Sequence, residues 1–224
     1  DDADLGSRKV VENAGTLIWY PAEVNTSIRP GWFYHAGEDD KVKTAEELLQ
    51  IYYKSVGGNA NFLLNIPPDR RGVIHANDAD CLEKLGQILR NTFEHDLSYG
   101  ASAAASETMD GHQDAGNILD GDPDTYWCPE PGTEKVQLEI HLKGEKVFDR
   151  VVLMEHIKSS GQRIEGFILE VNDGEDWREI YKGTVIGYKR ICCFQKVISS
   201  RIRLKITESR WYPTIAHVGV YLSE

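Results

Sequence analysis

The sequence predicts a protein of two domains: the last βα units of a (β/α)₈ barrel over residues 1–93, then an all-β sandwich over residues 100–224. Three observations predict this fold class. The first part of the chain has the order strand, loop, helix, strand, loop, helix, which is that of two βα units. The second part alternates apolar and polar residues with period two. Between them, residues 94–99 have the character of a linker.

The first βα unit begins with Leu17–Trp19, an apolar run that predicts a buried strand leading into a loop. Pro21 and Pro30 disfavour a helix in that loop, because proline fixes φ and lacks an N–H. A helix is predicted from Thr44, since threonine at the cap with glutamate three residues later forms a capping box. Its apolar face has helical spacing, and Gly57 and Gly58 end it; the face comprises Ala45, Leu48, Leu49, Tyr52 and Val56.

The second βα unit begins with Asn61–Ile66, a short apolar strand closed by two prolines. Asn77 with Asp80 predicts the start of the next helix. The inner face of that helix comprises Leu82, Leu85, Ile88 and Leu89. A closed barrel needs about 250 residues, and parallel strands are normally paired at both edges. We therefore expect the first domain to need barrel strands that lie outside this sequence.

The second domain is predicted from strands whose residues alternate between two faces. Val136–Leu142, Ile202–Ile206 and Val218–Leu222 each place apolar residues at every second position. Further apolar runs lie at residues 147–154, 164–171, 179–181 and 191–198. Short strands at this spacing, with turn residues between them, predict an all-β sandwich of about 125 residues.

Composition excludes several classes of function. The net charge of −11 opposes long-range attraction to nucleic acid or to an anionic membrane. No apolar run approaches the length of a membrane span, and the polar N-terminal residues are not a signal peptide. The abrupt start is expected of a fragment. The four cysteines (Cys81, Cys128, Cys192 and Cys193) lack zinc spacing and are predicted to be buried free thiols.

The stretch from Trp19 to His35 has the strongest functional signal. Glu23 follows a proline in a segment rich in aromatic residues. Sugar hydrolases place an acid just past a strand end among aromatic side chains, which offer flat faces to the sugar and raise the pKa of the carboxyl by desolvation. The alternative is structural: Glu23 caps a turn or pairs with Arg29.

The motifs PAEVNTSIRPGWFYH (residues 21–35) and NFLLNIPPDRRGVI (residues 61–74) resemble those of the family-29 α-L-fucosidases. The resemblance covers roughly residues 1–93. It implies that Glu23 is the general acid/base and that Trp32, Tyr34 and His35 lie around the fucose pocket. The family also needs an aspartate nucleophile on an earlier barrel strand, and no stretch before Trp19 resembles that strand.

The run NILDGDPDTYW (residues 117–127) and the closing pattern IRLKIT…PTIAHVGVY resemble a discoidin-like, coagulation factor 5/8 type C domain. Such jelly-roll domains serve sugar-degrading enzymes as family-32-like carbohydrate-binding modules. In these domains the first loop often holds a structural calcium, which here implies the ligands Asp120, Asp122 and Thr125. His217 stands where a glutamate usually completes that site, and the alternative is a solvated turn. No cofactor is implied for catalysis.

The remaining aromatic residues allow competing interpretations. Trp127 is predicted to fill the sandwich core. Trp211 and Tyr212 lie on a loop before the last strand and are candidates for a sugar platform, or for packing against the first domain. Arg163 is expected to form an ion pair with Glu155.

The sequence therefore predicts part of an exo-acting retaining α-L-fucosidase that releases terminal fucose. Glu23 would protonate the departing oxygen and then, as a carboxylate, deprotonate water. The nucleophile would lie upstream, so this chain alone is predicted to be inactive. The expected partners are fucosylated oligosaccharides or glycoconjugates and the missing barrel portion, and the intact protein is expected to be periplasmic or secreted. The alternative function is a non-catalytic carbohydrate-binding or interdomain module.

Overall fold

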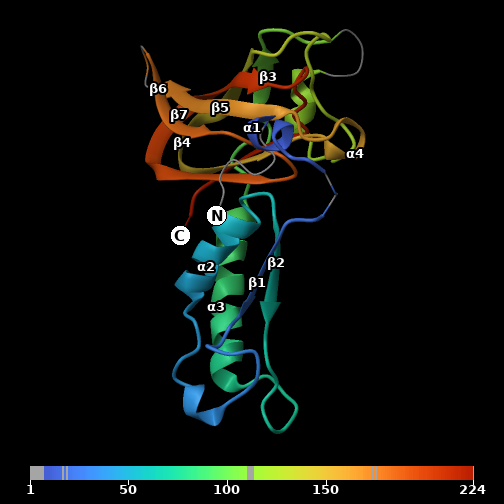
Figure 1. Cartoon of the computed structure of the whole chain (residues 1–224). Coiled ribbons are helices and arrows are strands. Elements are labelled where there is room, and N and C mark those ends of the chain that lie inside the picture. Colours follow the sequence, from blue (N-terminus) through green and yellow to red (C-terminus); the bar gives the residue numbers. More distant parts are fainter. Residues whose placement is uncertain are drawn as a thin grey trace. The chain divides into compact units, whose positions relative to one another are not determined.

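The computed structural model describes residues 8–16, 18, 20–109, 114–172, 174 and 176–223, and the chain forms two compact units (Figure 1). Residues 20–95 form an α/β unit. Residues 96–222 form a β unit, with which the short helix α1 (Arg8–Glu12) is grouped. No helix within these described ranges combines the length and the apolarity that crossing a membrane requires.

The α/β unit is built on two parallel strands, β1 (Glu23–Ser27) and β2 (Asn61–Asn65). The 3-10 helix η1 (Ala36–Glu38) and helix α2 (Ala45–Ser55) follow β1, and helix α3 (Ala76–Phe93) follows β2. The order of elements is that of two consecutive βα units. In Figure 1 the arrow of β2 shows that the carboxyl ends of this pair point toward the loops that lead into α2 and α3.

The starts of helices α2 and α3 test the capping signals that were read from the sequence. The capping box at Thr44 is confirmed: its backbone N–H donates to Glu47 Oε2 over 2.8 Å, and the N–H of Glu47 donates to Thr44 Oγ1 over 3.2 Å. Helix α3, predicted to start at Asn77, starts one residue earlier at Ala76. Its cap is His75, whose Nδ1 accepts the N–H of Asn77 over 3.3 Å. An imidazole can therefore do what the usual capping side chains do.

The first predicted strand is wrong in its position. Leu17 and Trp19 lie outside the described residues, and Ile18 is not in a strand and is 87% exposed. The strand of this βα unit is β1, which begins after Pro21. Its position is set by pairing: β2 pairs with Glu23–Ser27, and its two ends also bond to the residues that flank β1, since Asn61 donates its N–H to the carbonyl of Ala22 and Ile28 donates its N–H to the carbonyl of Asn65.

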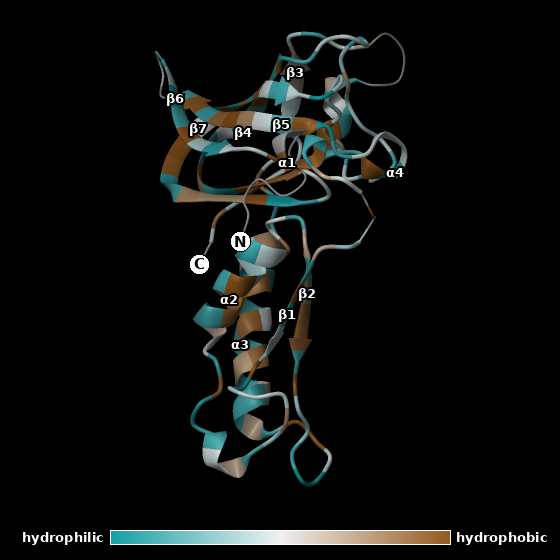
Figure 2. Cartoon of the chain, viewed as in Figure 1, coloured by the Kyte–Doolittle hydropathy of each residue, from teal (hydrophilic) through white to brown (hydrophobic). Residues whose placement is uncertain are grey.

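The core of the α/β unit is small. Its fully buried apolar residues are Ile28, Ala45, Leu48, Cys81 and Leu85. Residues packed against them come from β2, α2 and α3, and Figure 2 shows hydrophobic residues along β2 and on one side of each helix. The pair β1–β2 is the whole sheet in the described part of this unit, so each strand has one unpaired edge.

The described residues of the β unit form six strands in one hydrogen-bonded sheet. They are β3 (Ser102–Ala105), β4 (Val136–Met154), β5 (Ile164–Asn172), β6 (Trp177–Gly183), β7 (Arg190–Ser209) and β8 (His217–Tyr221). The spatial order is β3-β4-β7-β5-β6, and β8 pairs with the second half of β4. Two short helices, η2 (Ala115–Leu119) and α4 (Ile157–Ser160), lie in the connections.

Two strands are longer than the sequence pattern predicted. The separate apolar runs at 136–142 and 147–154 form the single strand β4, and those at 191–198 and 202–206 form β7 (Figure 1). The pairing register between β4 and β7 shifts between His141 and Lys146, which is where the predicted strands were divided. A register shift bends a strand and allows it to contribute to both layers of a sandwich.

The core of the β unit is large and closed. It comprises 23 buried apolar residues, and Trp127, at 0% exposure, is confirmed as one of them. Cys81, Cys128 and Cys192 are buried free thiols as predicted, and burial raises the pKa of Cys192. Cys193 is exposed, contrary to prediction, because successive residues of β7 point to opposite faces.

Candidate functional site

The candidate site lies at the carboxyl ends of β1 and β2. Ser27 and Asn65 are paired there, as the last residues of the two strands. The Nδ2 of Asn65 donates to Ser27 Oγ over 3.1 Å and to the carbonyl of Trp32 over 3.0 Å, and Ser27 Oγ donates to the carbonyl of Gly31 over 2.7 Å. These bonds fix the start of the β1–α2 loop against the end of β2. In a sheet of parallel strands this edge is where binding and catalytic side chains gather.

Arg29 is the centre of the site. Its side chain is fully buried, and its Nε donates to both oxygens of Asp78, over 3.1 and 2.9 Å. Its Nη1 donates to Asp39 Oδ1 over 2.9 Å. Burial by itself lowers the pKa of Arg29, but the bonds to the two carboxylates outweigh it and raise the pKa. The guanidinium is therefore a fixed positive charge, and its two partners come from the β1–α2 loop and from the first turn of α3.

Asp39 connects this arginine to an aromatic group. Its Oδ2 accepts the hydroxyl of Tyr34 over 3.2 Å and lies 3.5 Å from His75 Nε2. The rings of Tyr34 and His75 lie 6.0 Å apart, and the guanidinium of Arg29 lies 4.8 Å from the centre of the Tyr34 ring. Burial and the nearby Asp39 carboxylate raise the pKa of Tyr34, so its hydroxyl keeps its proton. These contacts restrict the side chains of Tyr34, Asp39 and His75, which together form a polar wall.

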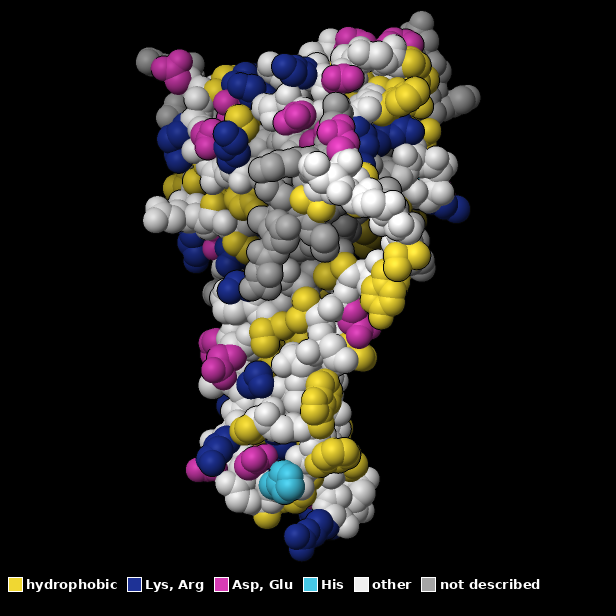
Figure 3. Space-filling model, viewed as in Figure 1, with side chains coloured by type: hydrophobic (Ala, Val, Ile, Leu, Met, Phe, Trp, Pro, Cys, Tyr) yellow, Lys and Arg dark blue, Asp and Glu magenta, His cyan; other side chains and the backbone are white. Residues whose placement is uncertain are grey.

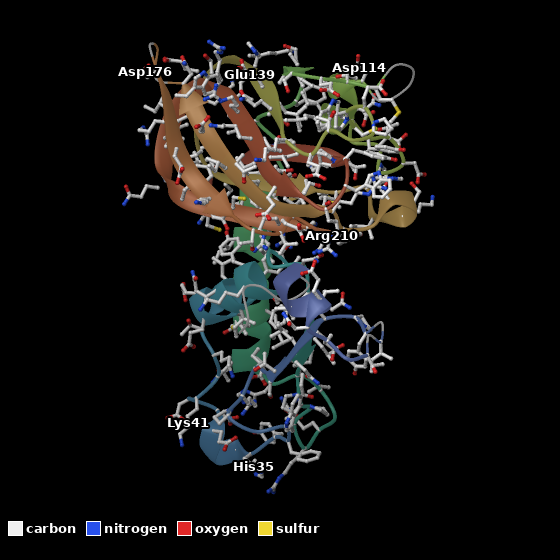
Figure 4. All side chains as sticks on the ribbon, turned by 45° about the horizontal axis from the view of Figure 1, so that its top comes forward. His35, Lys41, Asp114, Glu139, Asp176 and Arg210 are labelled. Atoms are coloured by element: carbon white, nitrogen blue, oxygen red, sulfur yellow. The ribbon has the colours of Figure 1, made fainter. Side chains whose placement is uncertain are left out.

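The β1–α2 loop also presents aromatic residues to solvent. Trp32 is 51% exposed and Phe33 is 78% exposed, whereas Tyr34 is half-buried in the network around Asp39. His35 is exposed, and Figure 4 places it at the tip of the α/β unit. Figure 3 shows hydrophobic side chains on the surface of the same end. Exposed indole and phenyl faces beside fixed polar groups are typical of a sugar-binding wall.

The loop after β2 adds one more charged pair. Asp69 is buried, and its Oδ2 accepts from Nε and Nη2 of Arg71 over 2.9 and 2.7 Å. The hydrogen bond to Arg71 lowers the pKa of Asp69, so this carboxyl is ionised. The Arg71 side chain is 72% exposed, which leaves part of its guanidinium accessible at the loop surface.

The predicted surroundings of Glu23 are wrong. Glu23 is the first residue of β1 and is exposed. It therefore lies at the amino end of the strand, about 13 Å from Ser27 at 3.3 Å per residue. Trp32 and Tyr34 follow the carboxyl end, so they do not surround it. The alternative pairing with Arg29 is also wrong, because Arg29 binds Asp39 and Asp78. Active sites of barrels lie at the carboxyl ends of the strands, which is the other end of β1.

The two aromatic residues predicted as a sugar platform in the β unit, Trp211 and Tyr212, differ in how accessible they are. Trp211 is 59% exposed, but the guanidinium of Arg163 lies 4.3 Å from the centre of the Tyr212 ring and covers one of its faces. Arg163 does not form the predicted ion pair with Glu155. Its side chain donates to the carbonyls of Ser160 and Tyr212, and Glu155 instead accepts the backbone N–H of Arg163.

In the loop predicted to bind calcium, side-chain oxygen atoms accept hydrogen bonds from other groups of the same loop. Asp120 accepts the N–H of Asp122 over 2.8 Å and the hydroxyl of Thr125 over 2.7 Å, and Asp122 accepts the N–H of Asp124 over 2.9 Å. Lys158 Nζ lies 2.7 Å from Asp124. Among the described residues, no group of three or more acidic, histidine or cysteine side chains is arranged to hold a metal ion. In this structure the turn is closed by its own hydrogen bonds, and calcium binding by Asp120, Asp122 and Thr125 stays a prediction.

Sequence reasoning missed the residues at the centre of the α/β site. Arg29 was considered only as a partner of Glu23, and Asp39, His75 and Asp78 were not considered. No local pattern could have found them, because they come together from the β1–α2 loop and the start of α3. Phe33 could have been considered, since it lies in the sequence between Trp32 and Tyr34, which were both predicted to lie around the fucose pocket.

Two family models match the chain. Residues 102–218 match the F5/8 type C domain and residues 9–94 match the α-L-fucosidase model. Among curated proteins, the chain is 38% identical over 207 residues to "Putative alpha-L-fucosidase 1" of Oryza sativa subsp. japonica and 36% identical over 213 residues to "Alpha-L-fucosidase 1" of Arabidopsis thaliana. The matches cover 91% and 92% of this chain but 40% and 41% of those proteins, so the chain spans about two fifths of their length.

Solved structures agree with these matches. A putative α-L-fucosidase from Bacteroides thetaiotaomicron superposes with a TM-score of 0.87 at 35% identity, over 92% of this chain and 46% of that one. A Ruminococcus gnavus GH29 fucosidase in complex with fucose superposes with a TM-score of 0.85 at 32% identity, over 92% of this chain and 42% of that one. A chitosan-binding module from a Paenibacillus enzyme, at 20% identity and a TM-score of 0.52, shares only the fold, over 57% of this chain.

Proposed function

The chain belongs to the F5/8 type C domain family and carries an α-L-fucosidase segment, and from that premise we propose that it is the C-terminal part of an exo-acting retaining α-L-fucosidase. The intact enzyme would hydrolyse terminal fucose from oligosaccharides or glycoconjugates. The α/β unit would supply one wall of its active site, and the β unit would be an appended sandwich.

One observation carries this proposal: the wall at the carboxyl ends of β1 and β2. Trp32 and Phe33 expose flat apolar faces, which suit the C–H face and the methyl group of a fucose ring. Tyr34, Asp39 and His75 lie next to them and are fixed by the buried Arg29, so they can orient hydroxyl groups without first becoming ordered. A wall of this kind binds one sugar ring, as an exo-acting enzyme requires.

The two catalytic carboxyl groups are proposed to come from barrel strands outside this chain. A retaining glycosidase needs a nucleophile and an acid/base about 5 Å apart. Asp39 and Asp78 at this site bind Arg29, and Asp69 binds Arg71, so each carboxylate is already engaged by an arginine. The hydrogen bond to Arg71 also lowers the pKa of Asp69, which makes that group a poor proton donor. Since Glu23 lies at the other end of β1, we assign the acid/base, like the nucleophile, to the missing portion.

The proposal is tested by comparing this chain with the full-length protein on an aryl α-L-fucoside. This chain alone should release no fucose, and the full-length protein should release it. Proton NMR of the first-formed product should show the α-anomer, because retention conserves configuration. Release of the β-anomer would contradict the retaining mechanism. Release of fucose by this chain alone would contradict the assignment of the catalytic carboxyl groups to the missing portion.

A further inference from the structure

Residues 96–99, which the sequence assigns to the linker, bind to the free edge of strand β8. In the described part of the β unit, β8 pairs with β4 along one edge and with no strand along the other. Backbone groups on that other edge need partners from elsewhere. Leu97 donates its N–H to the carbonyl of Val220 over 2.8 Å, and Ser98 Oγ lies 3.4 Å from the carbonyl of Val218. The chain that follows α3 therefore covers the free edge of β8.

Asp96 is the centre of this attachment. Its Oδ1 accepts the N–H of Val220 over 2.9 Å, the N–H of Ser98 over 2.8 Å and the hydroxyl of Ser98 over 2.6 Å. Its Oδ2 accepts the hydroxyl of Tyr221 over 3.2 Å. Burial raises the pKa of Tyr221, and the nearby Asp96 carboxylate raises it further, so the hydroxyl keeps the proton that it donates. One carboxylate thus takes four hydrogen bonds and joins its own turn to β8.

The segment itself is folded into two consecutive turns. The N–H of Tyr99 donates to the carbonyl of Asp96 over 3.2 Å, and the N–H of Ala101 donates to the carbonyl of Ser98 over 2.9 Å. Ser98 is 3% exposed, and Leu97 packs against the core of the β unit. Backbone, side-chain and core contacts all hold the same four residues, so they differ from a solvated, flexible linker.

Helix α3 restricts the chain on the other side of this segment. The helix ends at Phe93, and Glu94 continues its hydrogen bonding by donating its N–H to the carbonyl of Arg90 over 2.8 Å. Glu94 and His95 are then the whole joint between α3 and Asp96. A chain extends at most about 3.3–3.6 Å per residue, so a joint of two residues spans about 7 Å, and release of four more residues would lengthen it to about 20 Å.

We propose that the Asp96 carboxylate anchors a clasp, formed by residues 96–99 and β8, that confines bending of the chain between the two units to Glu94 and His95. The carboxylate accepts the N–H of Val220 while the next residue donates to the carbonyl of Val220, as a neighbouring strand would. Residues 96–99 therefore move with the sandwich. All contacts of the clasp lie within the β unit, so this inference is independent of the proposed function.

The test measures backbone order parameters of the whole 224-residue chain by ¹⁵N relaxation. In the parent, Leu97 and Ser98 should have order parameters of about 0.85, the value of rigid backbone. Asp96→Ala removes all four acceptor contacts and should lower these values below about 0.6, the range of flexible backbone. Chymotrypsin should cut after Leu97 and Tyr99 at least about tenfold faster in this variant, because cleavage follows the population of the open segment. Tyr221→Phe, which removes one of the four bonds to Asp96, should have a smaller effect on both measurements.

Asp114→Asn is the matched control. Asp114 also accepts the N–H of the residue two positions later, that of Gly116 over 2.7 Å, but this bond stays within its own turn. The control should leave the order parameters of residues 96–99 and the rate of cleavage unchanged. In the full-length protein, Asp96→Ala should leave kcat/KM for an aryl α-L-fucoside within about twofold of the parent, because distant sites without shared partners act independently.

Order parameters below about 0.6 for Leu97 and Ser98 in the parent would overturn this inference. So would an Asp96→Ala variant whose order parameters and cleavage rate equal those of the parent. Urea unfolding shows whether the β unit of each variant is intact, and a lower midpoint with no loosening of residues 96–99 would make Asp96 an ordinary stabilising residue. If Asp96→Ala does not fold, Asp96→Asn, which keeps the shape of the side chain and one acceptor oxygen, replaces it. Cleavage of Asp96→Asn should still be faster than that of the parent, and an unchanged rate would contradict the clasp. Inactivity of the full-length parent would contradict the proposed function and leave this inference standing.

Discussion

The α/β unit and the β unit differ in how complete they are. The β unit buries 23 apolar residues in a core covered by six paired strands. The α/β unit buries five, on two strands that each have an unpaired edge in the described part of the chain. The β unit thus has the features of a domain that folds alone, and the α/β unit has those of a piece that other strands complete.

This difference shows where function can be tested. A site that lies wholly within the β unit should work in this chain as it stands. Under the proposed function, a site in the α/β unit should need strands that lie outside this chain. The ion pairs of Arg29 form wholly within the α/β unit, with Asp39 from the β1–α2 loop and Asp78 from the first turn of α3.

The largest effect is expected from breaking the buried ion pair of the α/β unit. Asp78→Asn in the full-length protein leaves the Arg29 guanidinium, which is fully buried, without its principal partner. Losing one member of a buried pair costs about 3–5 kcal/mol of unfolding free energy. Urea unfolding measures it. Asp124→Asn, which breaks an exposed pair, is the matched control and should cost less than about 1 kcal/mol. Equal effects of the two variants would show that the Arg29 network does not hold the unit together.

The second prediction compares the units within this chain by hydrogen exchange. Amides of β1 and β2 should exchange on the order of 100-fold faster than those of β4 and β7, because few buried contacts oppose local opening of the small unit. Adding the missing barrel portion should slow the exchange of β1 and β2 and leave β4 and β7 unchanged. Full protection across Asn61–Asn65 in this chain alone would contradict the view that the α/β unit is incomplete.

The smallest effect is expected from pH, and it should appear in the β unit. Burial lowers the pKa of His156 and of His217 below the ordinary value of 6.5. Below pH 6.5 the unfolded chain therefore binds protons that the folded unit does not, so stability falls as pH falls. Burial raises the pKa of Glu155, which acts in the opposite direction at pH values above 4.5. The two histidines by themselves should lower the urea midpoint of β-unit unfolding at pH 5.5 relative to pH 7.5, and Glu155 should oppose this, so the histidine effect is measured as a difference between the parent and a variant that lacks both histidines.

A double variant, His156→Gln with His217→Gln, is the control for this pH effect. Relative to the parent, its midpoint should be higher at pH 5.5 than at pH 7.5, because the two histidines that destabilise the folded unit at low pH are gone and Glu155 remains. An unchanged pH dependence in the double variant would assign the effect to other groups.

Much of the fold could be predicted from local patterns. The capping box at Thr44 placed α2 because both of its partners lie within four residues. Alternation placed the strands of the β unit, although it could not show that 136–142 and 147–154 are one strand, since the register shift between them looks like a turn in the sequence. The first strand was placed too early, because strand limits depend on the partner strand, and Asn61 pairs with Glu23.

The site was harder to predict for the same reason. Displacing the strand moved Glu23 from its predicted place beyond the carboxyl end to the amino end. The aromatic residues Trp32 and Tyr34 were correctly placed in a loop, but nothing in their spacing showed that Asn65 would bind the carbonyl of Trp32 or that Asp39 would accept the hydroxyl of Tyr34.

The central claim is that the carboxyl ends of β1 and β2, and not Glu23, face the substrate. The most direct test is kcat/KM for an aryl α-L-fucoside in the full-length protein, comparing Glu23→Gln with Trp32→Ala. We predict that Glu23→Gln stays within about twofold of the parent, because an exposed residue at the amino end of a barrel strand has no contact with the sugar. Trp32→Ala should lose about tenfold or more with the aromatic face. A loss of several hundredfold in Glu23→Gln, with Trp32→Ala near the parent, would contradict the claim.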